Sequence, residues 1–449
     1  LTPARNATEY MNGLCNMSEY FEIAYAAASK RLCLFTGTGF SKALTQGNAP
    51  GWQELIEDVC DAHVGNSDLK ESLFPEVGSN PLRLEEAAQI VGMKLAEQGK
   101  NIHDVIASKI AAIEVSGQIP NIDKFFSKRN FRIVTTNYDK LSEKLAGSDC
   151  QSLSPGMPVP KSSSRVKVFH VHGSVDYPPR VVVTADDYFN FMNSETYFSR
   201  KLSTVLHENT VVVLGYSLGD VNLKGILNEY GGFMKNHFVG SSIFFVSRSP
   251  VDQPIRDYYA SCYGIRVIDN TDIEEFFKEL NRQYPRAKMI LSRSLEGIDK
   301  VLNEGSTFKD SFLKMEDSFA EIVSSLGAQG VSLDSQNVVK MFGDIVKKKQ
   351  KLCGENGAWE QYEHLASWLI NLGALIEIEG RSLETPYLKA VKYSMEHMSK
   401  EMLLGYSWHA YKRWDAGWKN VRATNRSLIK SYILGNSADE DAERIVSRG

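Results

Sequence analysis

The chain has 449 residues, of which 43% are hydrophobic, and its 51 basic and 55 acidic side chains give a net charge of −4. This is ordinary globular composition at a length that favours two or three domains, and it gives no general attraction to nucleic acid or anionic membranes. No apolar run reaches the roughly 18 residues of a spanning helix. The N-terminal Leu1-Thr-Pro-Ala-Arg5 lacks the layout of a secretion signal. We therefore expect a cytoplasmic protein with no membrane association.

The six cysteines are scattered, and no two of them form a Cys-x-x-Cys pair. That spacing argues against a structural zinc site. So few cysteines in so long a chain also argue against a disulfide framework. We expect reduced thiols and no metal at Cys15, Cys33, Cys60, Cys150, Cys262 and Cys353.

The first predicted strand, Leu32–Thr36, runs directly into Gly37-Thr-Gly39. Glycines at this point let the backbone turn tightly and approach a phosphate, and the following helix can direct its amide N–H groups at the anion. The third glycine of the usual dinucleotide fingerprint is missing. By itself, such a pair of glycines is most simply interpreted as a turn. Further along the chain, residues 82–96 have the clearest helical pattern of the segment that follows.

The next predicted strand, Phe131–Thr135, leads into Thr136-Asn-Tyr-Asp139. The neutral amide of Asn137 can position a water molecule or hold a ribose hydroxyl, and Asp139 can cap the next helix. An isolated Asn-x-Asp pair is more often a turn and a cap. The Pro- and Ser-rich stretch from residue 152 to 164 is predicted to be a loop.

A strand at Val166–His172 ends at Gly173 and carries two histidines on the same side, His170 and His172. Such a pair could bind a metal, but no third ligand is suggested nearby. His172 sits at the carboxyl end of the strand, where a general base would be useful near neutral pH. A structural histidine with its hydrogen bonds satisfied is the favoured interpretation of His170, and for His172 the two interpretations are even.

Further strands are predicted at 180–184, 210–214, 242–246 and 263–268, and the second of these ends in Gly215-Tyr-Ser-Leu-Gly-Asp220. In this second glycine loop Ser217 could donate to a phosphate, and Asp220 could cap a helix or bind a hydroxyl. Gly215-Tyr-Ser-Leu-Gly219 also matches the nucleophile elbow of serine hydrolases. A hydrolase of that kind is disfavoured because no later histidine falls at an obvious strand end.

Apolar strands that alternate with helix-length segments predict an α/β fold, a Rossmann-like open parallel sheet with helices on both faces. Ligands bind outside the carboxyl ends of such strands, where every polar cluster described above falls. After residue 285 the pattern becomes that of amphipathic helices, the first over residues 308–326. We therefore predict a domain at 1–285, with its core at about 30–285, and a helical C-terminal domain at 286–449 for assembly or regulation.

Together, the two glycine loops, Gly51-Trp52, Thr135-Thr-Asn-Tyr-Asp139 and His172-Gly173 resemble the sirtuin superfamily in order and spacing. They are most similar to the sirtuin-like NAD-hydrolysing domains of bacterial antiphage defence systems. The resemblance covers residues 30–285. It implies that Asn137 orients a water molecule and the nicotinamide ribose, and that His172 is a general base. It further implies that NAD⁺ is held by Gly37, Thr38, Gly39, Ser41, Asp139, Gly215, Ser217 and Asp220.

Two departures from the deacylating sirtuins decide between branches of the family. Deacylases carry a four-cysteine zinc module between the His and the second glycine loop, and residues 173–214 contain no cysteine. They also carry a Pro-Asp-Phe-Arg segment where this chain has Ala49-Pro-Gly-Trp-Gln53. The resemblance therefore implies a metal-free NAD⁺ glycohydrolase that cleaves NAD⁺ to nicotinamide and ADP-ribose, as an effector that depletes NAD⁺ in abortive infection. A module that senses NAD or ADP-ribose for a partner, and a zinc-free protein deacylase, are the alternatives.

The resemblance also implies homo-oligomers and, from chain size and the helical tail, assembly with a HerA-type ATPase. The chain itself has no Gly-x-x-x-x-Gly-Lys phosphate loop, so an ATPase would be a separate protein. Basic and aromatic residues alternate in Tyr411–Lys419, and Lys347–Lys351 is a basic run, so both could contact nucleic acid. A solvated helix face beside core aromatics is the favoured interpretation.

Overall fold

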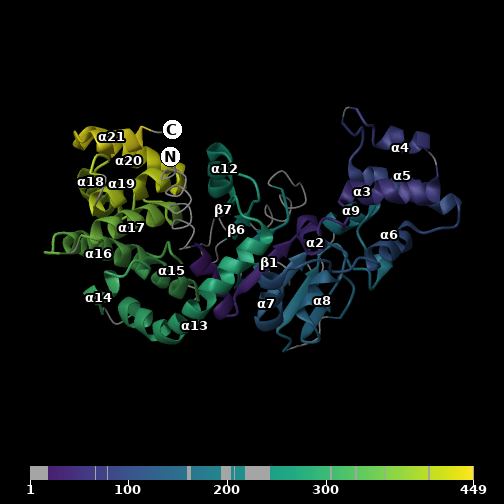
Figure 1. Cartoon of the computed structure of the whole chain (residues 1–449), viewed down its shortest axis with the longest axis horizontal. Coiled ribbons are helices and arrows are strands. Elements are labelled where there is room, and N and C mark those ends of the chain that lie inside the picture. The colour runs from purple at the N-terminus through teal and green to yellow at the C-terminus, as the bar shows by residue number, and fades with distance from the viewer. Residues whose placement is uncertain are drawn as a thin grey trace.

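Figure 1 shows the fold of the chain in a computed structural model. A central sheet lies between a group of helices at the C-terminal end and a smaller helical group that contains α3 to α6. The structure describes residues 19–65, 67–77, 79–158, 163–193, 204–206, 208–217, 243–303, 306–328, 331–357, 359–402 and 405–447.

The sheet has seven strands in the order β3-β4-β2-β1-β5-β6-β7, and every neighbouring pair is parallel. This confirms the predicted Rossmann-like open sheet. The strand predicted at 180–184 is wrong, because a 3₁₀ turn at Pro178–Arg180 leads there into extended chain outside the sheet. The strands are β1 (Leu32–Thr36), β2 (Phe131–Thr135), β3 (Cys150–Leu153), β4 (Val166–His170), β5 (Thr210–Leu214), β6 (Ile243–Val246) and β7 (Ile265–Ile268).

Successive residues of the central strand β1 are buried on opposite faces of the sheet, as the period of two requires. Leu34 packs in one apolar core and Phe35 in the other. The first core receives side chains from helical residues 19–28 and from α2 (Thr38–Leu44), α7 (Pro120–Lys128), α8 (Leu141–Ala146) and α13 (Ile273–Asn303). The second receives Tyr259 and Tyr263 of α12 (Gln253–Tyr263). Helices therefore cover both faces, as predicted.

A separate helical module follows α2 and has an apolar core of its own. Tyr138, Val181 and Val183 from the loops of the sheet pack into that core, which fixes the module against the carboxyl ends of the strands. Its elements are α3 (Trp52–Val59), a π-helical turn (Cys60–Val64), α4 (Ser67–Leu73), α5 (Leu84–Glu97) and α6 (Ile102–Ala111), and α9 (Ala185–Asn193) packs against α5.

The C-terminal region is helical, as predicted, with a core around Trp368, Tyr387 and Trp414. The single helix predicted over residues 308–326 is instead two helices, α14 and α15. The elements are α14 (Asp310–Leu313), α15 (Ser318–Ala328), α16 (Gln336–Cys353), α17 (Gln361–Leu375), α18 (Glu384–Glu396), α19 (Tyr406–Gly417), a 3₁₀ turn (Trp418–Asn420), α20 (Ala423–Asn436) and α21 (Glu440–Val446).

Several side chains of the two candidate nucleic-acid segments of this region turn inward, while Lys347 and Lys351 are exposed. Tyr411, Trp414 and Trp418 are buried in the helical core. Lys349, from the basic run, is buried and donates to the carbonyl of Leu313 at 2.6 Å. These three rings are core residues, so they are not available for stacking on bases.

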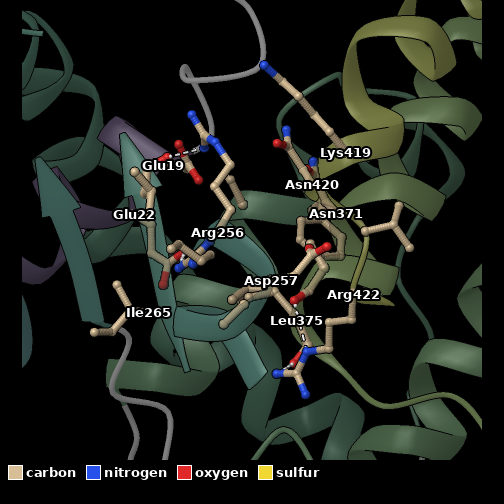
Figure 2. Close-up of a pocket in the computed structure, with 18 residues that line it drawn as sticks. Glu19, Glu22, Arg256, Asp257, Ile265, Asn371, Leu375, Lys419, Asn420 and Arg422 are labelled. Carbon is tan, nitrogen blue, oxygen red and sulfur yellow. Dashed lines mark hydrogen bonds and ion pairs between the residues drawn. The ribbon is translucent and has the colours of Figure 1, made fainter. Parts of the chain in front are cut away.

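The C-terminal helices meet the sheet region across a polar seam. Arg426 of α20 pairs with Asp257 of α12 at 2.5 Å, and Gln253 donates to the carbonyl of Lys419 at 2.6 Å. A small cavity of about 70 Å³ lies within the seam, and Figure 2 shows charged side chains lining it from both sides. The predicted boundary at 285–286 falls inside α13, which runs from Ile273 to Asn303. The division into two domains stays a prediction.

Candidate active site

A cavity of about 710 Å³ opens at the carboxyl ends of β1, β2, β4 and β5, facing the helical module. That volume is within the range of small-molecule sites. The strand order reverses beside β1, because β2 lies on one side of β1 and β5 on the other. A cavity at such a switch point is where an α/β sheet binds its ligand. Seven of the ten predicted site residues line it: Thr38, Ser41, Asn137, Asp139, His172, Gly215 and Ser217.

The two glycine loops touch each other at the edge of this cavity. The N–H of Gly37 donates to the carbonyl of Leu214 at 3.0 Å, and that of Gly39 donates to the carbonyl of Gly215 at 2.9 Å. A Cβ on Gly39 would lie 2.9 Å from the Gly215 backbone, so only glycine fits. Gly215 has φ +74°, in the left-handed region that glycine adopts without strain. These two N–H groups therefore hold the loops together, and the NAD⁺ contacts predicted for Gly37 and Gly39 stay predictions.

Tyr216 lies across the first glycine loop. A Cβ on Gly37 would lie only 2.7 Å from Cε2 of the Tyr216 ring. The Tyr216 hydroxyl is 2.6 Å from Oγ1 of Thr136 and donates to the carbonyl of Thr36 at 3.3 Å. The tyrosine thus links the loops that follow β1, β2 and β5. The remaining residue of the second predicted loop, Asp220, lies outside the described residues.

The orientation of the Asn137 side chain follows from its partners. Its Nδ2 donates to the carbonyl of Gly37 at 2.9 Å and to Oγ of Ser41 at 2.8 Å. A carbonyl oxygen can only accept, so the amide nitrogen must be on that side. Within the described part of the chain, Oδ1 of Asn137 has no partner, and the residue lines the cavity. The amide oxygen is therefore a fixed acceptor for a water molecule or a ribose hydroxyl.

Asp139 has protein partners on both carboxylate oxygens. Ser41 donates to Oδ2 at 2.6 Å, and the N–H of Leu141 donates to Oδ1 at 3.0 Å, which caps α8. Burial raises the pKa of Asp139, while these hydrogen bonds and the charge of His170 act in the opposite direction. Asp139 thus orders the Ser41–Asn137 pair as well as lining the cavity.

His172 faces an apolar wall of the cavity. Its ring makes edge contacts with the Tyr188 and Phe191 rings of α9, at centroid distances of 5.3 and 5.1 Å. No side chain in the described part of the chain hydrogen-bonds to the ring. Burial lowers the pKa of His172 from 6.5 to about 4, so the imidazole is neutral near pH 7. It can then accept a proton or a hydrogen bond from a ligand.

His170, two residues earlier, has partners on both ring nitrogens. Nδ1 is 3.0 Å from the carbonyl oxygen of Asn137, and Nε2 is 2.8 Å from Oε1 of Glu143. The favoured interpretation of His170 as a satisfied buried histidine agrees with this geometry. Among the described residues there is no group of three or more His, Cys, Asp or Glu side chains that could hold a metal ion.

Several cavity residues were not predicted from the sequence. Trp52 packs edge-on against Tyr138 at a centroid distance of 5.9 Å, and Arg83 places a guanidinium group at the rim. Trp52 belongs to a quoted motif, but nothing in the motif indicates that it faces a ligand. Arg83 and Tyr188 come from segments without any motif. Only the packing of the helical module against the sheet brings them to the site.

Comparison with known proteins finds a family match for part of the chain that forms this site. Residues 132–268 match the family model of the SIR2-like domain. The chain contains a SIR2-like domain. This match begins within β2 and includes Asn137, His172 and the second glycine loop.

Two curated proteins are similar to this chain. Defense-associated sirtuin 2 of Bacillus subtilis is 25% identical over 254 residues, which are 55% of this chain and 24% of that protein. NAD(+) hydrolase ThsA of Bacillus cereus (strain MSX-D12) is 31% identical over 100 residues, which are 21% of each. The chain thus spans about a quarter or less of the length of these relatives.

In the described part of the chain, no helix combines the length and the apolar character that crossing a bilayer requires.

Proposed function

We propose that this protein is an NAD⁺ glycohydrolase that cleaves NAD⁺ to nicotinamide and ADP-ribose. The observation that carries the proposal is one cavity that presents the amide oxygen of Asn137 and the neutral ring of His172 beside two interlocked glycine loops. A relative named as an NAD(+) hydrolase and another named as a defence-associated sirtuin support it. The proposed role is depletion of NAD⁺ in antiphage defence, by abortive infection.

The reaction breaks the bond between C1′ of the nicotinamide ribose and the pyridinium nitrogen. The electron pair of this bond passes to nicotinamide, which leaves as a neutral molecule, so little acid catalysis is needed. The ribose develops oxocarbenium character, as in glycoside hydrolysis. Water then adds to C1′ and loses a proton, which gives ADP-ribose.

Each proposed catalytic residue meets one requirement of this reaction. The fixed amide oxygen of Asn137 would accept a hydrogen bond from the attacking water and hold it near C1′. A water that is bonding to an oxocarbenium carbon becomes strongly acidic. The neutral imidazole of His172 can therefore take up its proton even though its pKa is about 4.

The binding groups follow from the same cavity. Thr38, Ser217 and the rim guanidinium of Arg83 would contact the phosphates, and Trp52 offers a ring for a base. In this proposal NAD⁺ is the substrate, and the chemistry requires no metal. Homo-oligomers and a HerA-type ATPase partner stay predictions of the family resemblance, and co-purification followed by mass measurement tests them.

The test is incubation of purified protein with NAD⁺, with nicotinamide and ADP-ribose quantified by chromatography, alone and with a candidate ATPase. We expect equal amounts of the two products, lost in Asn137→Ala and His172→Ala. Asn281→Ala is a matched control, because Asn281 is also a buried asparagine whose Nδ2 donates to a carbonyl, but on α13. Binding of NAD⁺ without product under every condition would instead support an NAD-sensing module. Product only with an acylated peptide would support a deacylase.

A further inference from the structure

A row of alternating charges runs beneath the loop that carries Asn137. Asp176 pairs with Lys140 at 2.6 Å, Lys140 pairs with Glu143 at 2.8 Å, and Glu143 contacts His170 at 2.8 Å. His170 is fully buried, and its other ring nitrogen meets the carbonyl of Asn137. The row therefore connects the protein surface at Asp176 to the main chain of a residue that faces the cavity.

The partners of His170 determine which of its nitrogens carry hydrogen. The carbonyl oxygen of Asn137 can only accept, so Nδ1 donates to it. Burial acts to raise the pKa of Glu143, but the hydrogen bonds and charges of His170 and Lys140 lower it to about 2. The Glu143 carboxylate holds the other side of the ring, with Oε1 at 2.8 Å from Nε2.

We propose that His170 is a positioning residue of the NAD⁺-hydrolysing site, whose ring, held by Glu143, donates from Nδ1 to the main-chain carbonyl of Asn137 and thereby fixes the amide oxygen that faces the cavity. The inference rests on the proposed function and adds a residue that contacts neither substrate nor water.

The location of His170 in the sheet explains why it can do this. It is the last residue of β4 and is in register with Thr135, the last residue of β2. Its ring therefore reaches across to the loop that begins after Thr135. The main chain of Asn137 is held from the other side by Thr135, whose Oγ1 accepts from the Asn137 N–H at 3.1 Å. The two contacts fix both polar groups of one peptide residue.

The charged groups that face His170 come from each element packed around it. Glu143 is on α8, and Asp139 and Lys140 are in the loop before that helix. Lys140 is itself paired with both Asp176 and Glu143.

Three variants separate positioning from a simple contribution to folding. The amide of His170→Asn can replace the Nδ1 donor, whereas that of His170→Gln extends toward Glu143 and leaves the Asn137 carbonyl without its donor. Glu143→Gln keeps a hydrogen-bonding side chain but removes the charge. His364→Gln is the matched control, because His364 also places Nδ1 against a main-chain carbonyl, that of Lys314 at 2.9 Å, in the C-terminal helices.

We expect kcat to fall about 10- to 100-fold in His170→Gln, with KM for NAD⁺ nearly unchanged, because a displaced water-holding group affects the reaction step. His170→Asn should recover most of this loss. Glu143→Gln should lose less activity than His170→Gln, because its amide can still hydrogen-bond to the ring. Equal activity of all variants per folded molecule, or equal losses in His170→Asn and His170→Gln, would overturn the inference while the glycohydrolase assignment stands.

A second measurement keeps this inference separate from the proposed function. Nitrogen-15 NMR of the histidine-labelled protein, assigned with His170→Gln, reports whether each ring nitrogen carries hydrogen. We expect Nδ1 of His170 to carry hydrogen, as its contact with the Asn137 carbonyl requires, and this holds even if the wild-type protein releases no nicotinamide. An Nδ1 without hydrogen would refute the inference independently of any activity.

Discussion

The burial of His172 makes the stability of the protein depend on pH in a defined window. The folded-state pKa is about 4, whereas an unfolded chain has the ordinary value of 6.5. Because the folded pKa is the lower one, the unfolded state takes up the proton first as pH falls. Stability from the neutral ring is thus fully present above about pH 6.5 and is lost as pH falls toward 4.

The size of the effect follows from the gap between the two values. At 1.36 kcal/mol per pKa unit, the difference between the folded and unfolded pKa of His172 corresponds to about 3 kcal/mol of unfolding free energy. About 2 kcal/mol of this stabilisation is lost by pH 5. Exposure does not reduce this figure, because only 3% of His172 is accessible to solvent. A His172→Phe protein keeps an aromatic ring against Tyr188 and Phe191 but cannot titrate, so it should lack this part of the pH dependence.

The assay is urea unfolding followed by circular dichroism at pH 7, 6 and 5, for the wild-type and His172→Phe proteins. The free energy of unfolding of the wild type should fall by about 2 kcal/mol more than that of the variant between pH 7 and pH 5. His397→Gln, at an exposed histidine of the C-terminal helices, is the control and should follow the wild type. Parallel pH curves for wild type and His172→Phe would refute the placement of a neutral, desolvated ring in the cavity.

Three further predictions concern the site and the seam. Asn137→Ala should lower the rate of nicotinamide release at least about 100-fold, while calorimetry still detects NAD⁺ binding. An equal loss of NAD⁺ binding would contradict a role of Asn137 that is confined to the reaction step. Gly39→Ala and Gly215→Ala should abolish NAD⁺ binding, because the added Cβ atoms would lie 2.9 and 2.1 Å from backbone atoms of the facing loop. Full NAD⁺ binding by these variants would disprove the close contact between the two glycine loops. Asp257→Ala should destabilise the protein by about 1–3 kcal/mol in thermal unfolding, because it leaves buried Arg426 without its carboxylate partner. Turnover should be unchanged, and a loss of turnover would show that the seam controls the site.

The parallel sheet was predictable because its strands are short apolar runs between turn signals. β5, Thr210–Leu214, is buried at every residue, as its sequence of threonine, three valines and leucine indicates. β3 was missed because Cys-Gln-Ser-Leu is half polar, which is tolerated at the edge of the sheet, where only β4 is a neighbour. The Val181–Val183 run has the composition of a strand, but its valines pack into the core of the helical module instead.

The site was predictable where its residues follow strands, because parallel strands bring their carboxyl ends to one edge. Asn137 and His172 meet at the cavity for that reason. The roles of individual N–H groups were not predictable. Whether the Gly37 amide faces a ligand or the neighbouring loop depends on the contact with β5, 177 residues later in the chain, and no local pattern reports it.

The most direct test of the account is the structure of the Asn137→Ala protein bound to NAD⁺, which should trap the uncleaved substrate. We expect the nicotinamide ribose in the cavity, with C1′ within about 4 Å of a water at the vacated amide position and beside the His172 ring. The pyrophosphate should contact Thr38 and the second glycine loop. Density for NAD⁺ at another place, or none in the cavity at saturating NAD⁺, would contradict the assignment of this cavity as the NAD⁺-cleaving site.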